Sequence, residues 1–534
     1  MKTHGLNANI LSGLHFSFFL LFILCAATNS FAAVAGCDGT GNCYIYAAAS
    51  GSGNGSSWTN AYTGFGTGAG KVDPASMTRG ATYWIATGSY GAQNFSSPNS
   101  GSTVITLEGA TTTSHGPASD WNDSFAGQAT FIGNSFVSTD YWTFDGQAVP
   151  GCSYPEGSGD SGDHCYTIHF WNKANSSGSA ITAANSVSLI YVELEGTGQG
   201  FPNNTSTSDK CNTNNCGAWA DNAIAGSPNN LYVGYSYVHH TGNTQFQMNN
   251  TPAPTGHTYE YNWISYNHTG QNGQHDEAYS LYASNVVIRY NVFQDISGSG
   301  IITTAGANTP ALSNWAVYGN LFFWDATYAA FDQYGLATCD NAILDFLGES
   351  MSGHIYFYNN TIAGMYSSVA NQAGSAFSTM PISGLSGYST GNPTVIIENN
   401  LWYGSAYVYG DYSSYCSVVG GATCTQDYNA SYQGGIPSGD NWQTNSPAGA
   451  HDYNVSGSGS PFLNFAAFTI AGLQLVTPDP FASHAGTALG SPYNVDMFGV
   501  TRGANGTWDL GALQLSGGSG TAPAPPTNLQ VNVN

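Results

Sequence analysis

The chain has 534 residues, of which 31 are acidic and 7 are lysine or arginine, and its formal net charge at pH 7 is −24. This charge excludes the nucleic-acid-binding classes, which need a basic surface. It also argues against simple ionic capture of a polyanionic glycan, which would need bridging cations here. Only 7% of the residues are charged, while 68 are glycine and 34 are tyrosine. This composition favours tight turns and a neutral surface rich in hydroxyl and amide groups.

The first 35 residues predict a signal peptide. Lys2 precedes an apolar run from Phe16 to Ala27, and small residues follow at 30–32 and 33–35, where a signal peptidase could cut. The apolar run is too short for a membrane span, and no second long apolar stretch follows it. We therefore expect a soluble, exported protein that is secreted or held at the cell surface.

Residues 36 to about 95 predict an N-terminal opening segment in which short strands alternate with stretches rich in glycine and serine. Its characteristic phrases are Ser57-Trp58, Ala61-Tyr62 and Thr87-Gly88-Ser89-Tyr90. Further strands are expected at Val104–Gly109, Ala129–Asn134 and Tyr141–Gly146.

One strand phrase then recurs through the centre of the chain. It occupies Leu231–Val238, Thr258–Ile264, Val286–Phe293, Ala316–Phe322, Ile355–Ile362 and Val395–Trp402. A polar residue falls at the same place in each phrase: Ser236, Asn262, Asn291, Asn320, Asn360 and Asn400. The steps between these residues are 26, 29, 29, 40 and 40. A repeat of this length with one strand phrase per unit indicates a solenoid, which leaves a long lateral surface free for an extended partner.

The repeated asparagine has two interpretations. Equivalent amides that stack from coil to coil can bond to their neighbours and so satisfy a polar group inside a turn, where an unpaired one costs roughly 1–3 kcal/mol. Alternatively, asparagine only marks turns. The fixed offset from an apolar run favours the ladder. The phrases are rich in β-branched and aromatic residues, and no helical period of useful length appears.

The C-terminal region closes with a second set of phrases. Asp496, Gly499 and Arg502 precede the run Asp509-Leu510-Gly511-Ala512. We interpret this region as a terminal cap that hides the last open edge of the solenoid, with Arg502 in a structural ion pair rather than in catalysis. Residues 516–534 form a tail rich in glycine and serine and then in proline.

Together, the opening phrases and the closing phrases resemble those of secreted bacterial right-handed parallel β-helix repeat proteins of the pectate-lyase-like superfamily. The resemblance implies an all-β fold, a right-handed parallel β-helix with an N-terminal opening segment and a C-terminal cap. The expected organisation is a signal peptide at 1–35, the β-helix with its caps at 36–515 and the tail at 516–534. The resemblance also implies a carbohydrate-active protein, although this fold hosts lyases, hydrolases, adhesins and passive surface proteins.

Cysteine usage agrees with export. Proximity suggests four disulfides, Cys37–Cys43, Cys152–Cys165, Cys211–Cys216 and Cys416–Cys424, and leaves Cys339 over. No cysteine or histidine spacing indicates zinc. The acidic loops at 37–42 and 159–164 could hold Ca²⁺, but turn chemistry explains both. Ca²⁺ is therefore the one cofactor considered, and no metal ligand is assigned.

The densest polar cluster lies between Asn267 and Tyr282. Strand alternation would send His275, Glu277 and Tyr279 outward together, and such a group can perform acid–base chemistry on a sugar. The predicted catalytic set is His275, Asp276, Glu277, Tyr279 and Arg289. In the structural alternative, Glu277 only pairs with Arg289, the one arginine of the central solenoid.

A row beside this cluster is expected if the strands near 223–227, 244–248, 275–282, 300–305 and 329–334 share a sheet. The predicted substrate-binding residues along this row are Gln245, Gln247, His268 and Asp332. The leading hypothesis is an exported, monomeric β-helix protein that binds or cleaves polysaccharide through a lateral groove, as a lyase or a glycoside hydrolase. The alternative is a non-catalytic surface, adhesive or structural solenoid.

Overall fold

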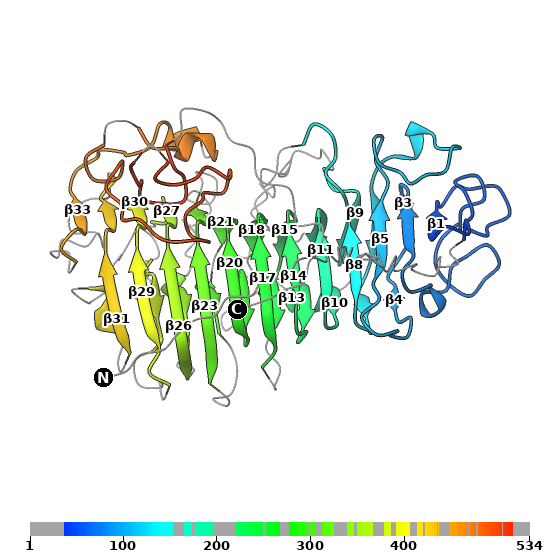
Figure 1. The fold of residues 1–534 in the computed structure, drawn as a ribbon, viewed down its shortest axis with the longest axis horizontal. Helices are drawn as coiled ribbons and strands as arrows, with labels where there is room; N and C mark the ends of the chain where they lie inside the picture. The colour runs from blue at the N-terminus through cyan, green and yellow to red at the C-terminus, as the bar shows by residue number, and fades with distance from the viewer. Residues whose placement is uncertain are drawn as a thin grey trace, which may run out of the picture. The chain divides into compact units, whose positions relative to one another are not determined.

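The computed structural model describes most of the chain from residue 37 onward. The described residues are 37–152, 165–173, 177–196, 220–248, 253–267, 277–296, 298–304, 311–324, 339–346, 350–366, 379–385, 391–405, 414–419, 422–434, 436, 449–467, 469–476, 479–504 and 506–515. Within them the chain forms a right-handed parallel β-helix built from three parallel sheets (Figure 1). This confirms the predicted fold class.

Each coil contributes a strand to each sheet in turn, and every pairing between the strands of the three sheets is parallel. Sheet 1 contains β1 (Asn42–Ile45), β2 (Thr82–Ile85), β5 (Ile105–Gly109), β8 (Trp142–Asp145), β11 (Val187–Ile190), β14 (Tyr232–Gly234), β17 (Thr255–Glu260), β20 (Ser284–Arg289), β23 (Leu312–Tyr318), β26 (Met351–Tyr358), β29 (Thr394–Glu398) and β31 (Thr423–Asp427).

Sheet 2 contains β3 (Gly88–Ser89), β6 (Ala129–Ile132), β9 (Ile168–Trp171), β12 (Val192–Glu195), β15 (Tyr237–Thr241), β18 (Trp263–Asn267), β21 (Val292–Ile296), β24 (Leu321–Phe323), β27 (Thr361–Ala363), β30 (Leu401–Tyr403), β32 (Ala430–Tyr432) and β33 (Tyr453–Val455). Sheet 3 contains β4 (Asn94–Phe95), β7 (Ser135–Val137), β10 (Ser177–Ala183), β13 (Ala220–Gly226), β16 (Phe246–Met248), β19 (Tyr279–Leu281), β22 (Gly298–Thr303), β25 (Cys339–Asp345) and β28 (Ile382–Ser383).

Short 3₁₀ turns are the helical elements of the described residues: η1 (Pro74–Ser76), η2 (Asp123–Phe125), η6 (Tyr415–Val418), η7 (Phe465–Ala467) and η8 (Ala471–Leu473). Within the same residues, no helix has the length and apolar character that crossing a bilayer requires.

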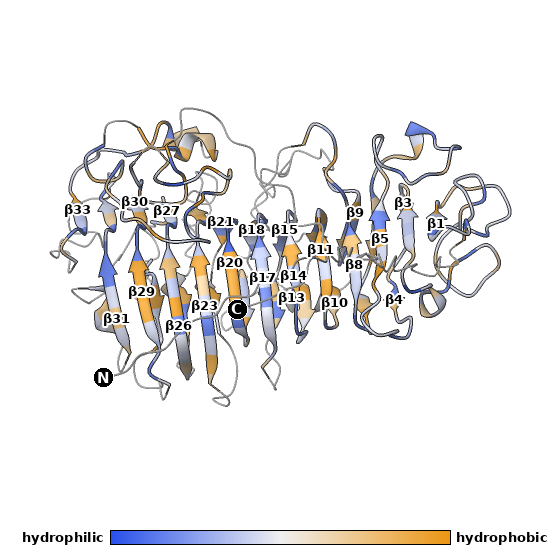
Figure 2. Ribbon diagram, in the orientation of Figure 1, coloured by the Kyte–Doolittle hydropathy of each residue, from blue (hydrophilic) through white to orange (hydrophobic). Residues whose placement is uncertain are grey.

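The core lies between the three sheets and follows from alternation along each strand, where one side chain points in and the next points out. Figure 2 shows apolar and polar segments following one another along the strands of sheet 1. Equivalent side chains stack from coil to coil. Phe293 and Phe322, for example, lie 4.5 Å apart with nearly parallel rings. Such stacking lets each coil bury its apolar face on the next one.

The asparagine ladder forms at the corner between sheets 1 and 2. In the section from Asn262 to Asn400, each side-chain oxygen accepts a hydrogen bond from the backbone N–H of the ladder residue one coil earlier, at 2.9–3.1 Å. Each of these side-chain N–H groups also donates to a backbone carbonyl. Ser236 begins this section, and Asn429 and Asp452 extend it beyond the predicted residues. The ladder interpretation is confirmed.

The residue just before each rung turns the chain through a left-handed backbone conformation. Tyr235, Tyr261 and Tyr290 occupy it with φ between 55° and 58°, and Gly319 with φ of 67°. A tyrosine is strained there, whereas glycine is not. The tyrosine rings stack along the corner, with centroids 4.7 Å apart for Tyr235 and Tyr261. This stacking offsets part of the backbone strain.

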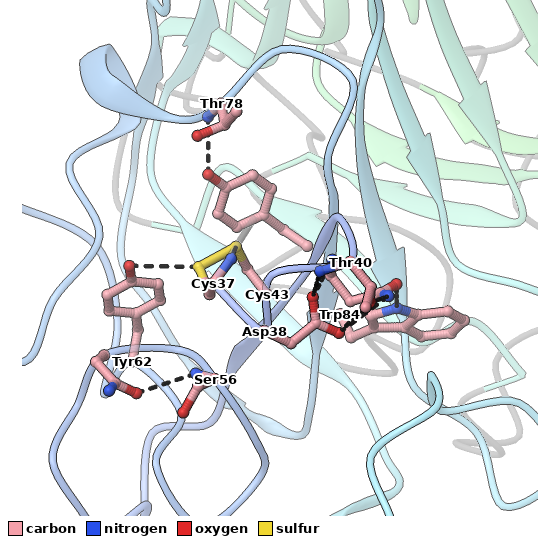
Figure 3. Close-up of a disulfide and its surroundings, with 11 residues drawn as sticks. Cys37, Asp38, Thr40, Cys43, Ser56, Tyr62, Thr78 and Trp84 are labelled. Carbon is pink, nitrogen blue, oxygen red and sulfur yellow. Dashed lines mark hydrogen bonds between the residues drawn. A yellow bond between two sulfur atoms is a disulfide. The ribbon is translucent and has the colours of Figure 1, made fainter. Parts of the chain in front are cut away.

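The opening segment is fixed by a disulfide. Cys37 and Cys43 are bonded, and Tyr62 lies beside Cys37 in the same region (Figure 3). Asp38 accepts hydrogen bonds from the backbone and side chain of both Thr40 and Asn42. The carboxylate therefore closes a turn, as the turn interpretation of residues 37–42 predicted.

Two further predicted disulfides form, Cys152–Cys165 and Cys416–Cys424. Cysteines 211 and 216 lie outside the described residues, as does the acidic loop at 159–164. Disulfides of this kind persist in oxidising compartments.

The C-terminal segment corrects one expectation. Residues 479–515, the C-terminal strap, lie along the side of the last coils and not only across their end (Figure 1). The strap begins beside Tyr432, whose hydroxyl donates to Asp479. It then contacts earlier coils, where Asn359 donates to the Tyr493 carbonyl and Tyr290 donates to that of Val495. The polar corner of each coil therefore provides hydrogen-bond partners for the strap along the side of the solenoid.

Arg502 holds the strap together from inside. It is 3% exposed, and its guanidinium donates to the carbonyls of Asp509, Gly511 and Ala512. Its predicted structural role is confirmed, although the main partners are backbone carbonyls rather than a carboxylate.

Candidate functional site

The outer face of sheet 2 carries a dense group of ionisable side chains where β9, β12 and β15 lie side by side. Ile168, Phe170, Val192 and Leu194 point into the core, so the alternate residues of these strands point outward. The register places His169 opposite Glu193, and Glu195 opposite both Trp171 and His239. We name His169, Glu193, Glu195 and His239 the histidine–glutamate centre.

Short distances join the four side chains. His169 Nε2 lies 3.0 Å from Glu195 Oε2 and 3.9 Å from Glu193 Oε1. His239 Nε2 lies 3.1 Å from the same Glu193 oxygen. His169, Glu193 and His239 are buried, whereas the side chain of Glu195 is 18% exposed. Solvent therefore reaches the centre at Glu195.

Two neighbouring side chains, Gln128 and His240, contact the centre and orient it. The Gln128 side-chain N–H₂ donates to the Tyr166 carbonyl and to Glu193 Oε2, while its oxygen lies 3.1 Å from His169 Nδ1. His240 contacts His239 through the two Nδ1 atoms. Burial and the adjacent His239 lower the pKa of His240 to about 3. His240 is therefore neutral at ordinary pH.

Aromatic rings and one cation border the centre. The Trp171 ring stacks on His169, with centroids 5.7 Å apart, and Lys173 Nζ lies 4.2 Å from the centroid of the Trp171 ring. Tyr237 stacks on His239 at 4.0 Å. Trp263 follows Tyr237 in the same register row on β18. This face is partly exposed. It combines aromatic rings, an ammonium group and a cluster of carboxylates and imidazoles, and it therefore suits an extended polar ligand.

The predicted catalytic set does not converge in the described residues. Tyr279 was expected to point outward, and this expectation is wrong. Its side chain is fully buried between Phe246 and Tyr259, whose ring centroids lie 4.4 and 4.7 Å away. Burial raises the pKa of the Tyr279 phenol well above its usual value. The strand begins only at Tyr279, so alternation could not be counted through the preceding turn.

Arg289 lies elsewhere. It points outward from sheet 1, where its guanidinium pairs with Glu260 at 2.5 Å and donates to the Tyr318 hydroxyl at 2.9 Å. Its predicted place beside Glu277 is therefore wrong, and so is the structural alternative in which those two residues pair. Sequence proximity misled here because residues on consecutive strands of one coil belong to different sheets.

Glu277 lies at the turn before β19, where it is 1% exposed and accepts a hydrogen bond from Thr244 at 2.7 Å. Gln247 points away from the core on β16 and accepts a hydrogen bond from Asn222. Gln245 was expected in the same binding row, and this is wrong. Gln245 is fully buried and donates across the interior to the Ser265 carbonyl on β18 at 2.6 Å. The roles of Glu277 and Gln247 stay predictions.

His268, His275, Asp276 and Asp332 lie outside the described residues. Four of the five strands expected to share a sheet do so, as β13, β16, β19 and β22. The fifth, at 329–334, lies outside the described residues, and β22 pairs there with β25 (Cys339–Asp345).

Sequence reasoning missed the histidine–glutamate centre. Its four residues come from three strands of three successive coils, so no local spacing unites them. One signal was present. In the phrase VELE the two glutamates stand at alternate positions, which places both on one face of a strand.

No family model and no curated protein matches the chain. Among solved structures, it resembles pectate lyase Pel9A, with 12% identity, coverage of 89% of this chain and 96% of that one, and a TM-score of 0.42. It also resembles the PL6 family polysaccharide lyase Pedsa3628 from Pseudopedobacter saltans, with 13% identity, coverage of 71% and 87%, and a TM-score of 0.37. For the PL6 family alginate lyase AlyGC the identity is 12%, the coverage 71% and 51%, and the TM-score 0.34.

Proposed function

We propose that this chain binds a polysaccharide containing uronic acid across the outer face of sheet 2 and cleaves it by β-elimination at the histidine–glutamate centre. The observation that carries the proposal is the grouping of this centre with the Trp171 ring and the Lys173 ammonium group on one partly exposed face. The chain acts as an exported monomer in this proposal, and its disulfides support the export.

Each element of the face has a chemical role in such a reaction. Trp171 stacks on a sugar ring, and Lys173 pairs with the sugar carboxylate, which makes the adjacent C–H more acidic. A base from the centre takes that proton, the electron pair forms a carbon–carbon double bond, and the glycosidic oxygen leaves with a proton. One ammonium group on an acidic protein binds such a polyanion locally, although the net charge of −24 repels it at long range.

Elimination fits the centre better than hydrolysis. Hydrolysis of a glycoside uses two carboxyl groups on opposite sides of the bond that breaks. Here Glu193 and Glu195 come from one face of one strand, and each has a carboxylate oxygen 3.0–3.1 Å from a histidine nitrogen. This face also holds imidazoles and the Lys173 ammonium group. These groups suit the abstraction of a proton next to the carboxylate of a sugar.

The test is a panel of polysaccharides with and without uronic acid, scored for absorbance of the unsaturated product. We expect cleavage of at least one uronate polymer, a loss of at least 100-fold in kcat for Glu195→Gln and His239→Ala, and a raised KM for Lys173→Ala. His354→Ala and Glu398→Gln on sheet 1 are the matched controls and should leave turnover unchanged.

Two results would overturn the proposal. Cleavage that survives in Glu195→Gln and His239→Ala would remove the centre from the reaction. Binding of a uronate polymer without any unsaturated product would establish the non-catalytic surface protein instead.

A further inference from the structure

The protonation of His169 can be assigned from its neighbours. The side-chain N–H₂ of Gln128 faces two oxygens that can only accept, the Tyr166 carbonyl at 3.1 Å and Glu193 Oε2 at 2.5 Å. The Gln128 oxygen must therefore be the atom 3.1 Å from His169 Nδ1, and Nδ1 carries a proton. In the neutral imidazole, Nε2 then presents a lone pair.

That lone pair is buried and faces carboxylates. His169 is 4% exposed, and its Nε2 makes no hydrogen bond. The nearest acidic atoms are Glu195 Oε2 at 3.0 Å and Glu193 Oε1 at 3.9 Å. A lone pair that faces two anionic oxygens in a buried place is repulsive unless a cation lies between them.

The spacing suits a metal ion. Ligands at about 2.1 Å from a tetrahedral metal lie about 3.4 Å from one another. The separations of 3.0 and 3.9 Å between His169 Nε2 and the two carboxylates lie on either side of this value. The ligand atoms of His169, Glu193 and Glu195 all lie within 4.8 Å of one another. Although His169 Nε2 and Glu195 Oε2 lie 3.0 Å apart, the imidazole and the carboxylate are not aligned as in a hydrogen bond.

We propose that His169 Nε2, Glu193 and Glu195 bind one divalent transition-metal ion of the Zn²⁺ class. One imidazole nitrogen with two carboxylate oxygens suits such an ion better than Ca²⁺, which prefers oxygen ligands alone. Gln128 orients the ligand histidine, and His239 donates to Glu193, as the neighbours of metal ligands do. Three protein ligands leave a further position open, on the side where Glu195 meets solvent.

This inference rests on the proposed function in that it concerns the same centre, but its test needs no polysaccharide. Untagged full-length protein is freed of metal with a chelator and dialysed against ZnCl₂ or CaCl₂, and the bound metal is quantified. We expect one Zn²⁺ per chain and at least tenfold weaker binding in His169→Ala and in Glu195→Gln. His354→Ala and Glu398→Gln should bind Zn²⁺ as the wild type does.

A second measurement guards against misfolding of a variant. Co²⁺ bound to the wild-type protein should give visible absorption bands, and Glu195→Gln should change these bands while its melting temperature stays within a few degrees of the wild type. Absence of Zn²⁺ binding, Zn²⁺ binding that both variants retain, or tighter binding of Ca²⁺ would each overturn the proposal. Zn²⁺ binding together with no cleavage of any uronate polymer would overturn only the proposed function.

Discussion

At the scale of the residue, surroundings decide what one side-chain type does. His169 Nε2 faces two carboxylates, whereas His257 is fully enclosed between the Pro228 carbonyl and the Tyr259 hydroxyl. Burial lowers the pKa of His257 to about 4, so it stays neutral. The surroundings of a carboxyl group matter in the same way. Glu108 lies opposite another acid, Asp145, on the neighbouring strands β5 and β8, and both face away from the core.

Glu108 provides a prediction on pH. Burial and the neighbouring Asp145 raise the pKa of Glu108 to about 7, from 4.5 in the unfolded chain. The stability linked to this group is complete below pH 4.5 and is lost as the pH rises through 7, because the charged form is disfavoured in the fold. Glu108→Gln should therefore raise the free energy of unfolding at pH 8 by up to about 3 kcal/mol. The melting temperature should rise with it at pH 8 and change little at pH 4.5.

The matched control for that prediction is Asp120, whose pKa shift has the opposite sign. Burial would raise its pKa, but hydrogen bonds from Thr59 and Trp58 outweigh burial and lower it. Asp120→Asn should lower the melting temperature at pH 8. A Glu108→Gln variant that is less stable than the wild type at pH 8 would contradict the expected sign.

At the scale of the element, the corner between sheets 1 and 2 defines the coil. A left-handed residue turns the chain, and the next residue supplies the rung that ties one coil to the neighbouring one. Each interior rung is buried and fully bonded. Asn320, for example, donates to the Ile288 carbonyl and to Asn360, and accepts from the Asn291 backbone. The ladder therefore resists a shift of register between coils.

Asn320→Ala should test the ladder. The substitution leaves the Asn291 N–H and the Ile288 carbonyl without their side-chain partner in a buried corner, so we expect a cost of about 1–3 kcal/mol in unfolding free energy. Asn229→Ala is the control. The Asn229 side chain also bonds between coils, donating to Asn185 and accepting from the Thr255 N–H, but it is exposed, so water can replace the amide. Equal losses in urea-unfolding experiments on the two variants would show that ladder burial contributes nothing.

At the scale of the whole molecule, stability is distributed along one dimension. Each coil contacts chiefly its neighbours, but the C-terminal strap also joins coils that are far from it in sequence. Gly511 donates to the Asn399 carbonyl and Ala512 to the Thr361 hydroxyl. The strap thus ties the coils of β21 to β32 together, while the coils of β1 to β8 make no described contact with it.

Removal of residues 479–534 should loosen these two regions unequally. We expect faster amide hydrogen exchange at the corners that the strap contacts, Asn359–Thr361 and Asn399–Leu401, and unchanged exchange in β2, β5 and β8. Hydrogen exchange followed by mass spectrometry measures both regions in one sample, and the N-terminal strands serve as the internal control. Uniform loss of protection along the chain would show that the solenoid unfolds as a single unit.

The fold could be predicted from the sequence because its determinants are local and repeated. The asparagine at a fixed offset from an apolar run marks the corner in every coil, and hydrogen bonds join these residues at separations of 26, 29, 29, 40 and 40, the predicted steps. Close cysteine pairs and the structural role of Arg502 were predicted for the same reason, since each depends on residues near one another in the chain.

The candidate site depended on the tertiary structure. Which side chains meet on the face of a solenoid is decided by the register between coils and by which sheet each strand joins. Arg289 was therefore assigned to the neighbourhood of Glu277 although it pairs with Glu260 on sheet 1, and Tyr279 was directed outward although it fills the core. The sequence alone determined that the chain coils and where each coil turns. Only the stacking of those coils brought His169 to Glu193 and Glu195, because contacts between strands of successive coils leave no local pattern.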